Sequence, residues 1–224
     1  MKREEVRDRI IRIGVVPAVR VFSYEDARFA SDAVCQAGIP IVEVTMTVPG
    51  AIDLISELVR TQRDLIVGAG TVFDIETAQH CIHAGVGFLT STGLDLEIVE
   101  LANKKEVLIF PGVLTPTEVH AAQKAGCDLV KIFPCSQVGG PSYIRALKGP
   151  FPKVQMIAAG GVTQTNAAEF ILAGAAALGI GGDLIPRKAL KMRDAHWIQE
   201  LSRRFTKLIA EARTQISSAH DFTK

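Results

Sequence analysis

Short runs of β-branched and other apolar residues alternate with segments of helical periodicity along the whole chain. This alternation is typical of a parallel sheet built from repeated strand–helix units. Most of the apolar runs are almost continuous, which indicates strands that are covered on both faces. We expect eight strands, near Val15–Val19, Ile41–Thr45, Leu65–Ala69, Phe88–Ser91, Val107–Phe110, Leu129–Phe133, Val154–Ala158 and Ala176–Ile180.

The segments between these runs have the spacing and the end signals of helices. Ile52, Ile55 and Val59 recur at helical spacing in one of them. In another, residues 115–118 read Thr-Pro-Thr-Glu, which predicts a capping box with Thr115 as the N-cap residue. Glycine suits the end of a helix because it adopts the left-handed backbone conformation. Alanine–glycine pairs stand at that place in Ala37-Gly38, Ala84-Gly85, Ala125-Gly126 and Ala173-Gly174.

The alanine–glycine pairs repeat at intervals of roughly two strand–helix units, which suits a barrel. We therefore predict one domain, residues 1–224, folded as a single (β/α)8 TIM barrel. The first residues predict a helix that closes the bottom of the barrel, and the residues after Arg187 predict an amphipathic helical tail on its outer wall. An open doubly wound sheet is the alternative. It needs a glycine-rich turn after the first strand, where residues 17–20 read Pro-Ala-Val-Arg.

Composition narrows the kinds of partner. The 25 Lys and Arg residues nearly cancel the 24 Asp and Glu residues, so nothing indicates a nucleic-acid partner, and attraction for an anion must be local to a site. The densely charged first residues are unlike a signal peptide, and no apolar run is long enough to span a membrane. The four cysteines show no Cys-x-x-Cys spacing, so we expect reduced thiols and a cytoplasmic protein.

Lys131 is the one lysine on a predicted strand, where it stands among branched apolar residues. In barrels of this kind the active site lies at the C-terminal ends of the strands. Burial disfavours an ammonium group, and the neutral amine that results is a nucleophile for ketones. Lys131 is therefore a candidate for forming a Schiff base. A structural lysine held in an ion pair is the alternative.

Two more charged residues, one inside a predicted strand and one directly after another, are candidates for the same site. Glu43 lies inside the second predicted strand. Burying a carboxylate there costs free energy, so we expect it to be ion-paired or to take part in catalysis. It is the candidate general acid and base beside Lys131. A buried ion pair between the two is the alternative, and both interpretations can hold at once. Arg20, at the end of the first strand, is a candidate for binding a carboxylate or phosphate, although a solvent-facing arginine fits there equally well.

Glycine pairs follow the seventh and eighth predicted strands. These are Gly160-Gly161 and Gly181-Gly182. Exposed backbone amides near a helix N-terminus bind anions, and the loops after these two strands are the usual phosphate site of a barrel. Tight turns also use glycine pairs. Asp183, directly after the second pair, opposes a phosphate because like charges repel.

Other clusters are weaker candidates. Glu76, His80 and His83 are metal-ligand types on one predicted helix, but an outer helix does not reach the mouth of a barrel, so we expect no metal site. Cys135 is near Lys131 in sequence and is a candidate for lining the same pocket.

Several short stretches of the sequence together form a specific pattern. They are residues 43–50 (EVTMTVPG), 67–72 (VGAGTV), 111–116 (PGVLTP), 130–134 (VKIFP), 139–142 (GGPS) and 148–152 (KGPFP). This pattern resembles the KDPG/KHG aldolase family, whose members are Schiff-base aldolases acting on 2-keto-3-deoxy-6-phosphogluconate and 4-hydroxy-2-oxoglutarate. The similarity runs from about Val15 to Leu184. The resemblance implies a Schiff base on Lys131, Glu43 as general acid and base, a homotrimer, and no metal or organic cofactor.

The resemblance also implies substrate-binding residues. Thr71 and Phe133 line the family's pocket, and the two glycine-pair loops hold phosphate. Thr47 stands where one branch of the family has Arg, and Thr92 stands within Ser-Thr-Gly where the family usually has Ser-Pro-Gly. We include both in the predicted substrate site. Ala159 replaces a usual Thr, and Asp183 stands where some members have Ser. These departures concern the substrate more than the reaction.

The sequence therefore predicts a class I aldolase that cleaves a 2-keto-3-deoxy (phospho)sugar acid or 4-hydroxy-2-oxoglutarate to pyruvate and an aldehyde. A phosphosugar isomerase or synthase on the same barrel is one alternative, in which Lys131 is never covalently modified. A non-catalytic phosphate-binding barrel is the other, in which a ligand binds without turnover.

Overall fold

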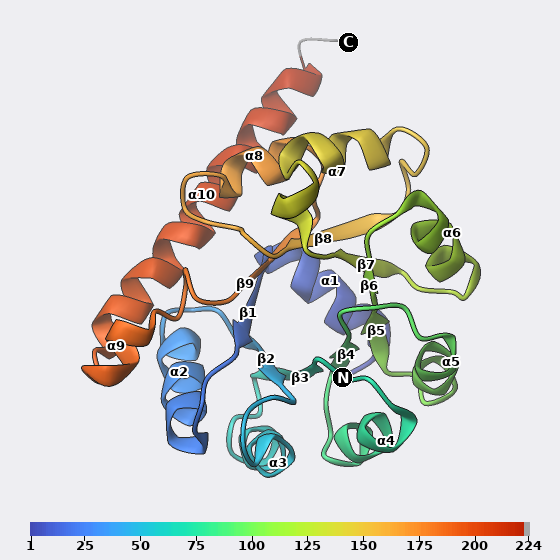
Figure 1. Cartoon of the computed structure of the whole chain (residues 1–224). Helices are drawn as coiled ribbons and strands as arrows, with labels where there is room; N and C mark the ends of the chain where they lie inside the picture. The colour runs from blue at the N-terminus through green and yellow to red at the C-terminus, as the bar shows by residue number, and fades with distance from the viewer. Residues whose placement is uncertain (222–224) are drawn as a thin grey trace.

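A computed structural model describes the backbone of residues 1–221 and the side chains of residues 1–218. All strand pairs are parallel, and the sheet curls around a central axis with helices outside it (Figure 1). The strands are β1 (Val15–Val19), β2 (Ile41–Thr45), β3 (Ile66–Gly70), β4 (Phe88–Thr90), β5 (Leu108–Phe110), β6 (Gly112–Val113), β7 (Leu129–Ile132), β8 (Gln155–Ala159) and β9 (Ala177–Ile180). Their spatial order is β5-β4-β3-β2-β1-β9-β8-β7-β6.

The fifth predicted strand is β5, and a further short strand that was not predicted, β6, follows it after Pro111. Proline has no N–H to donate to a sheet, so it interrupts the ladder. β5 pairs with β4 on one side, β6 pairs with β7 on the other, and the Pro111 carbonyl accepts a hydrogen bond from Lys131 N at 2.9 Å. The two pieces together occupy one position in the ring. The predicted (β/α)8 barrel is therefore confirmed.

The outer helices alternate with the strands, and their ends follow the predicted signals. The glycines of the four alanine–glycine pairs all have a positive φ, between 83° and 105°. At residue 115 the Thr hydroxyl accepts from Glu118 N, and Glu118 Oε2 accepts from Thr115 N at 2.8 Å, so the capping box is confirmed. The helices are α2 (Tyr24–Gln36), α3 (Ala51–Thr61), α4 (Ile75–His83), α5 (Leu96–Lys104), α6 (Pro116–Lys124), α7 (Pro141–Lys148) and α8 (Ala167–Leu172), with a 3-10 turn η1 (Cys135–Val138) after β7.

Glu118→Ala is expected to lower the free energy of unfolding by about 1 kcal/mol near pH 7, which is typical for losing a cap. Hydrogen bonds from the backbone of Thr115 and Leu114 lower the pKa of Glu118. A pKa that is lower in the folded than in the unfolded state stabilises the fold above the unfolded pKa, and this contribution is lost as the pH falls through the folded value. The free energies of unfolding of the wild-type protein and of Glu118→Ala, measured in urea, should therefore converge as the pH falls below about 4. A constant difference down to pH 3 would contradict this account.

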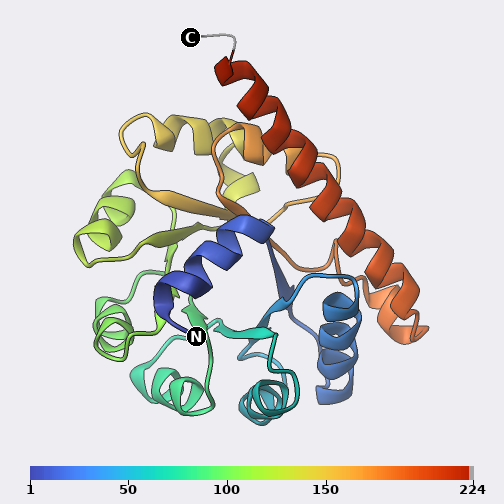
Figure 2. The same cartoon turned by 180° about the vertical axis from the view of Figure 1, so that it is seen from behind.

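Helices also cover the bottom and one side of the barrel. α1 (Arg3–Ile13) runs across the N-terminal end, as Figure 2 shows, and buries Val6 and Ile10. α10 (Ala195–Asp221) lies along the outside and packs against α2 and α8. The predicted helix at the bottom of the barrel is confirmed, and α10 confirms the outer-wall helix of the predicted tail. Within the described part of the chain, no helix is both long enough and apolar enough to cross a bilayer.

The predicted tail needs one correction, because it is two helices rather than one. α9 (Arg187–Lys191) is a separate short helix that precedes α10. The chain turns at Arg193, which has a φ of 50°, and Asp194 Oδ1 then accepts a hydrogen bond from Trp197 N at 2.9 Å at the start of α10. Arg193 also pairs with Asp26 at 3.0 Å, which fixes this turn to α2. α9 therefore lies near the mouth of the barrel rather than on its outer wall.

Candidate active site

A cavity of about 630 Å³ opens at the C-terminal ends of β1, β2, β7, β8 and β9. Barrel enzymes carry their active sites at this end. Most of the predicted site residues line this one cavity, although they come from distant parts of the sequence. They are Arg20, Glu43, Lys131, Phe133, Gly160, Gly161, Gly181 and Gly182.

Lys131 and Glu43 face each other at the base of this cavity. Their side chains come from β7 and β2, and Lys131 Nζ lies 3.7 Å from Glu43 Oε1. Only 5% of Lys131 and 2% of Glu43 is exposed, and no other charged residue is buried among those whose side chains the structure describes. Glu43 Oε1 accepts no hydrogen bond from a described protein group. The two opposite charges therefore lie close together inside the barrel, where each offsets part of the cost of burying the other.

The residue after the lysine strand adds an aromatic wall. Lys131 Nζ lies 5.6 Å from the centre of the Phe133 ring, which also lines the cavity. Low-dielectric surroundings of this kind strengthen the electrostatic interaction between Lys131 and Glu43. The geometry supports an amine nucleophile with an acid–base partner beside it.

Three predicted site residues do not line this cavity, namely Thr47, Thr71 and Thr92. The Thr47 hydroxyl is hydrogen-bonded to that of Thr45 at 2.8 Å. Thr92 packs its backbone against Gly112, where an added Cβ would lie 2.7 Å from Thr92 Cα. Thr71 has a φ of 62°, which is rare for a β-branched residue, and its buried hydroxyl has no described partner. Their predicted contact with substrate stays a prediction.

The loop after β8 is held tightly in place. Gly160 and Gly161 have φ angles of 85° and 80°, which residues with side chains rarely adopt. Ser136 N donates to the Gly160 carbonyl at 3.1 Å, and the Ser136 hydroxyl donates to the Gly161 carbonyl at 2.8 Å. A Cβ on Gly161 would lie 2.5 Å from Ser136 Cβ. This loop therefore requires glycine at both positions.

Sequence reasoning missed a group of residues at the outer rim of the cavity. Arg187 and Lys191 of α9 line it, and Arg187 stacks on Phe22, with its Cζ atom 4.8 Å from the ring centre. Phe22 is 72% exposed. The available signal was the spacing of Arg187 and Lys191, because residues four apart lie on one face of a helix. Lys191 falls in the predicted outer tail, which begins after Arg187, so this spacing is not interpreted as part of the site.

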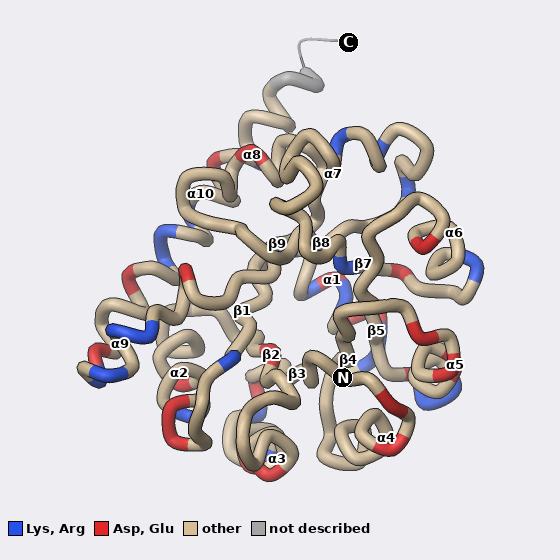
Figure 3. Tube along the Cα trace, in the orientation of Figure 1, with Lys and Arg blue, Asp and Glu red and all other residues tan. Residues whose placement is uncertain are grey.

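The rim has more positive than negative charge. Arg20, Arg187 and Lys191 line it and have no ion-pair partner among the described residues, and Figure 3 shows basic residues both at the end of β1 and on α9. Asp183 also lines the cavity and is exposed. Asp26 lines it too, but its charge is offset by the ion pair with Arg193. The local balance therefore favours an anion.

The expectation that Cys135 lines the pocket is wrong. Its side chain is fully buried, and Sγ lies 3.7 Å from the Gly140 carbonyl oxygen. Burial raises the pKa of the Cys135 thiol to about 11. The physical reason is the 3-10 turn η1, which begins at Cys135 and directs this side chain into the core. In the described part of the chain, no three His, Cys, Asp or Glu side chains gather as metal ligands would.

The model of one protein family, described as KDPG and KHG aldolase, matches residues 6–201. The chain belongs to the KDPG and KHG aldolase family. It is 31% identical to the 2-dehydro-3-deoxy-phosphogluconate aldolase of Treponema pallidum over 199 residues, which cover 88% of this chain and 94% of the relative. Family membership makes the protein an aldolase, which is a lyase, and confirms the resemblance found in the sequence.

Two solved structures of similar fold add detail about the family. The KDPG aldolase of Legionella pneumophila, with pyruvate captured at low pH as a covalent carbinolamine intermediate, superposes with a TM-score of 0.80. It is 31% identical, and the match covers 85% of this chain and 92% of that one. A cube-shaped protein cage, designed by fusing symmetric oligomeric domains, has a TM-score of 0.85 at 28% identity, over 94% of this chain and 77% of that one.

Proposed function

We propose that this family member is a class I aldolase that cleaves a 2-keto-3-deoxy (phospho)sugar acid or 4-hydroxy-2-oxoglutarate to pyruvate and an aldehyde, through a Schiff base on Lys131. The observation that carries the proposal is the buried Lys131–Glu43 pair, 3.7 Å apart at the base of the cavity. The covalent carbinolamine of pyruvate in the Legionella relative supports an amine nucleophile.

The chemistry follows from the two groups. The neutral Lys131 amine attacks the C2 ketone, and loss of water from the carbinolamine gives an iminium ion. Glu43 accepts the C4 hydroxyl proton through a bridging water while the C3–C4 bond breaks and its electrons move into the iminium, which leaves an enamine and the aldehyde. Glu43 returns the proton to C3, and hydrolysis frees pyruvate and Lys131. Covalent catalysis divides one difficult carbanion step into easier ones.

A retro-aldol assay tests the proposal. Purified protein is incubated with phosphorylated and unphosphorylated 2-keto-3-deoxy acids and with 4-hydroxy-2-oxoglutarate, and released pyruvate is measured. We expect pyruvate from at least one of them. Isomerisation of a phosphosugar without pyruvate release, or phosphate binding without turnover, would support one of the two alternatives instead.

We further propose that the aldehyde half of the substrate carries an anion, which the rim of the cavity binds. The glycine-pair loops offer backbone amides, and Arg20, Arg187 and Lys191 add positive charge. The Asp183 carboxylate would repel a phosphate. Three basic side chains and the backbone amides of two loops would attract it, so the net effect is attraction. Phosphate is the anion that these groups suit best, because guanidinium and backbone N–H groups both bind its oxygens.

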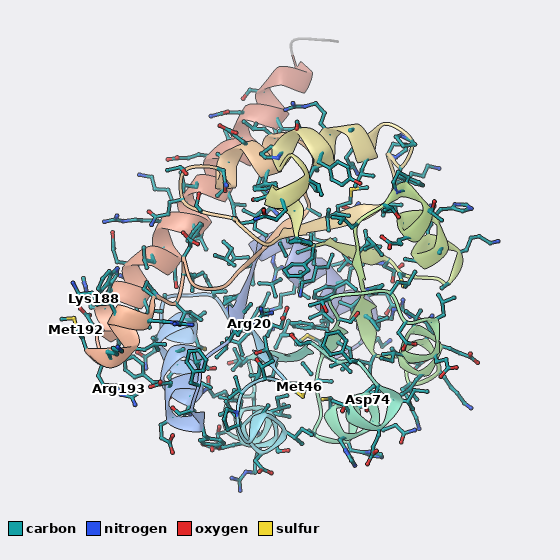
Figure 4. The ribbon with its side chains drawn as sticks, in the orientation of Figure 1. Arg20, Met46, Asp74, Lys188, Met192 and Arg193 are labelled. Carbon is teal, nitrogen blue, oxygen red and sulfur yellow. The ribbon has the colours of Figure 1, made fainter. Side chains whose placement is uncertain are left out.

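Arg187→Gln is expected to raise KM for the phosphorylated substrate by about tenfold, which corresponds to about 1.4 kcal/mol of lost binding. KM for the unphosphorylated 2-keto-3-deoxy acid should change little, because this substrate lacks the phosphate that Arg187 is proposed to bind. Lys188→Gln is the matched control, since it removes the same charge from the same helix but lies outside the cavity lining. Figure 4 labels Lys188 at the periphery and Arg20 at the mouth. Equal effects of both variants would contradict the proposal.

We propose that the chain is one domain, because its buried apolar residues form a single core cluster. We also propose that three copies of this domain assemble as a homotrimer. The similar designed cage was made by fusing symmetric oligomeric domains, which supports an oligomeric assembly for this fold. Phe73 and Leu96 are 61% and 53% exposed at the starts of the adjacent helices α4 and α5, and clustered exposed apolar residues mark interfaces. The cytoplasmic location expected from the sequence stays a prediction.

Leu96→Asp is expected to reduce the mass found by sedimentation from that of a trimer to that of a monomer, because a carboxylate in an apolar interface lacks a partner. Leu172→Asp is the control, since Leu172 is also exposed but lies on α8, away from α4 and α5. A wild-type protein that sediments as a monomer would contradict the trimer. A trimer that survives Leu96→Asp would contradict this location for its contact.

A further inference from the structure

Glycine occupies two positions of β3 that face the interior of the barrel. Gly68 is level with Glu43, and Gly70 is level with Thr45, in the register between β2 and β3. Alternate residues of a strand point to the same side, so Gly68 and Gly70 share one face. A side chain from a neighbouring strand fills the space beside each glycine. The Phe88 ring lies against Gly68, and the Glu43 carboxyl group lies against Gly70.

The contact between Gly70 and Glu43 leaves no room for a larger residue. A Cβ at residue 70 would lie 2.5 Å from Glu43 Cδ and 2.6 Å from Glu43 Cγ, and closer still to Oε1. Carbon atoms in contact prefer a separation of about 3.5–4.0 Å. Gly70 is not among the glycines with a positive φ, so the position requires a missing side chain rather than an unusual backbone.

The backbone cannot easily move to relieve such a contact. Met46 N donates to the Gly70 carbonyl at 2.8 Å, which joins the end of β3 to the chain just after β2, three residues beyond Glu43. Separating the strands here would break that bond and leave buried polar groups unpaired. An added methyl group would therefore displace the Glu43 carboxyl group rather than the strand.

We propose that Gly70 is a positioning residue for the aldol reaction. Its bare Cα lets the Glu43 carboxyl group lie against β3, with Oε1 held 3.7 Å from Lys131 Nζ. The carboxylate is therefore located by packing on one side and by the lysine on the other. This inference rests on the proposed role of Glu43 as general acid and base.

The kinetic test combines Gly70→Ala with Glu43→Gln. Gly70→Ala is expected to lower kcat on the order of a hundredfold, the effect of misplacing a reacting group by about 1 Å, with little change in KM. Glu43→Gln alone should lower kcat by a similar factor, because it removes the proton acceptor. In the Gly70→Ala protein the carboxyl group is already displaced, so adding Glu43→Gln should lower kcat little further. Equal losses from Glu43→Gln in both backgrounds would overturn the proposal.

A stability test remains informative even if Gly70→Ala folds poorly. Gly70→Ala should lower the Tm of the wild-type protein but barely change that of the Glu43→Ala variant, because all three nearest atoms belong to Glu43. Gly68→Ala is the matched control on the same strand face. Its Cβ would lie 2.5 Å from Phe88 Cδ2, so it should lower the Tm equally in both backgrounds. If Gly70→Ala also lowers both equally, or unfolds both, Gly70 is not positioning Glu43.

The two proposals fail in different ways. If Glu43→Gln keeps near-normal turnover, Glu43 is not the acid–base group, and the proposed function must change. The stability cycle does not involve turnover, so it still reports whether Gly70 and Glu43 compete for the same space.

Discussion

Borohydride reduction in the presence of pyruvate is expected to leave one reduced pyruvyl group on Lys131, found by mass spectrometry of the digested protein. Reduction traps the iminium ion as a stable secondary amine. Lys131→Met should abolish this labelling and lower turnover by roughly 10⁴-fold or more, the scale of losing a catalytic nucleophile. Lys131→Met has the largest expected effect of these substitutions, because no Schiff base can form without the Lys131 amine.

Lys148 is the internal control for this labelling. Burial lowers the pKa of Lys148, so reactivity governed by pKa alone would label it too. Its Nζ, however, donates to the carbonyls of Pro152 and Val154 at 2.8 and 3.0 Å, and it does not line the cavity. An adduct on Lys148 instead of Lys131, or no adduct, would reject the proposed mechanism.

Glu43→Gln is expected to lower kcat by about a hundredfold or more, the usual effect of losing a general acid and base. Glutamine keeps the shape against Gly70 and removes the proton acceptor. Trapping of pyruvate on Lys131 should partly survive, since the amine remains. Near-normal turnover would refute the assignment.

The loss must be separated from unfolding, because removing one partner of a buried pair destabilises a protein by about 3–5 kcal/mol. Turnover of Glu43→Gln should therefore be measured well below its Tm, with circular dichroism at the same temperature. A folded protein with low turnover supports a chemical role. A protein that regains full turnover on cooling would indicate that Glu43 acts only through stability.

Much of the fold could be predicted because strands and helices leave local signals. Continuous apolar runs located the strands to within a residue or two, since each is covered on both faces. Lys131 and Glu43 were recognisable because burying a charged residue in such a run costs free energy, unless the charge is paired or takes part in function. The short strand β6 was not predicted, although Pro111 before it indicates an interrupted ladder.

The missed features depend on contacts that no local pattern encodes. Arg187 reaches the cavity because a turn at Arg193 and its ion pair with Asp26 hold α9 against α2. Gly70 matters through a side chain from another strand. Cys135 is only two residues after Phe133, which lines the cavity, but it faces the core because η1 redirects the chain after β7. Such effects follow from tertiary packing rather than from residue spacing.

The strand order has a consequence for how activity returns when the protein refolds. β2 and β7 are separated by β1, β9 and β8 in the ring, so four strand spacings lie between Glu43 and Lys131 along the sheet. In a flat sheet that path would be roughly 19 Å. The 3.7 Å separation therefore exists only after the sheet has curled. Regain of turnover during refolding should report ring closure, and should lag behind the recovery of helical circular dichroism.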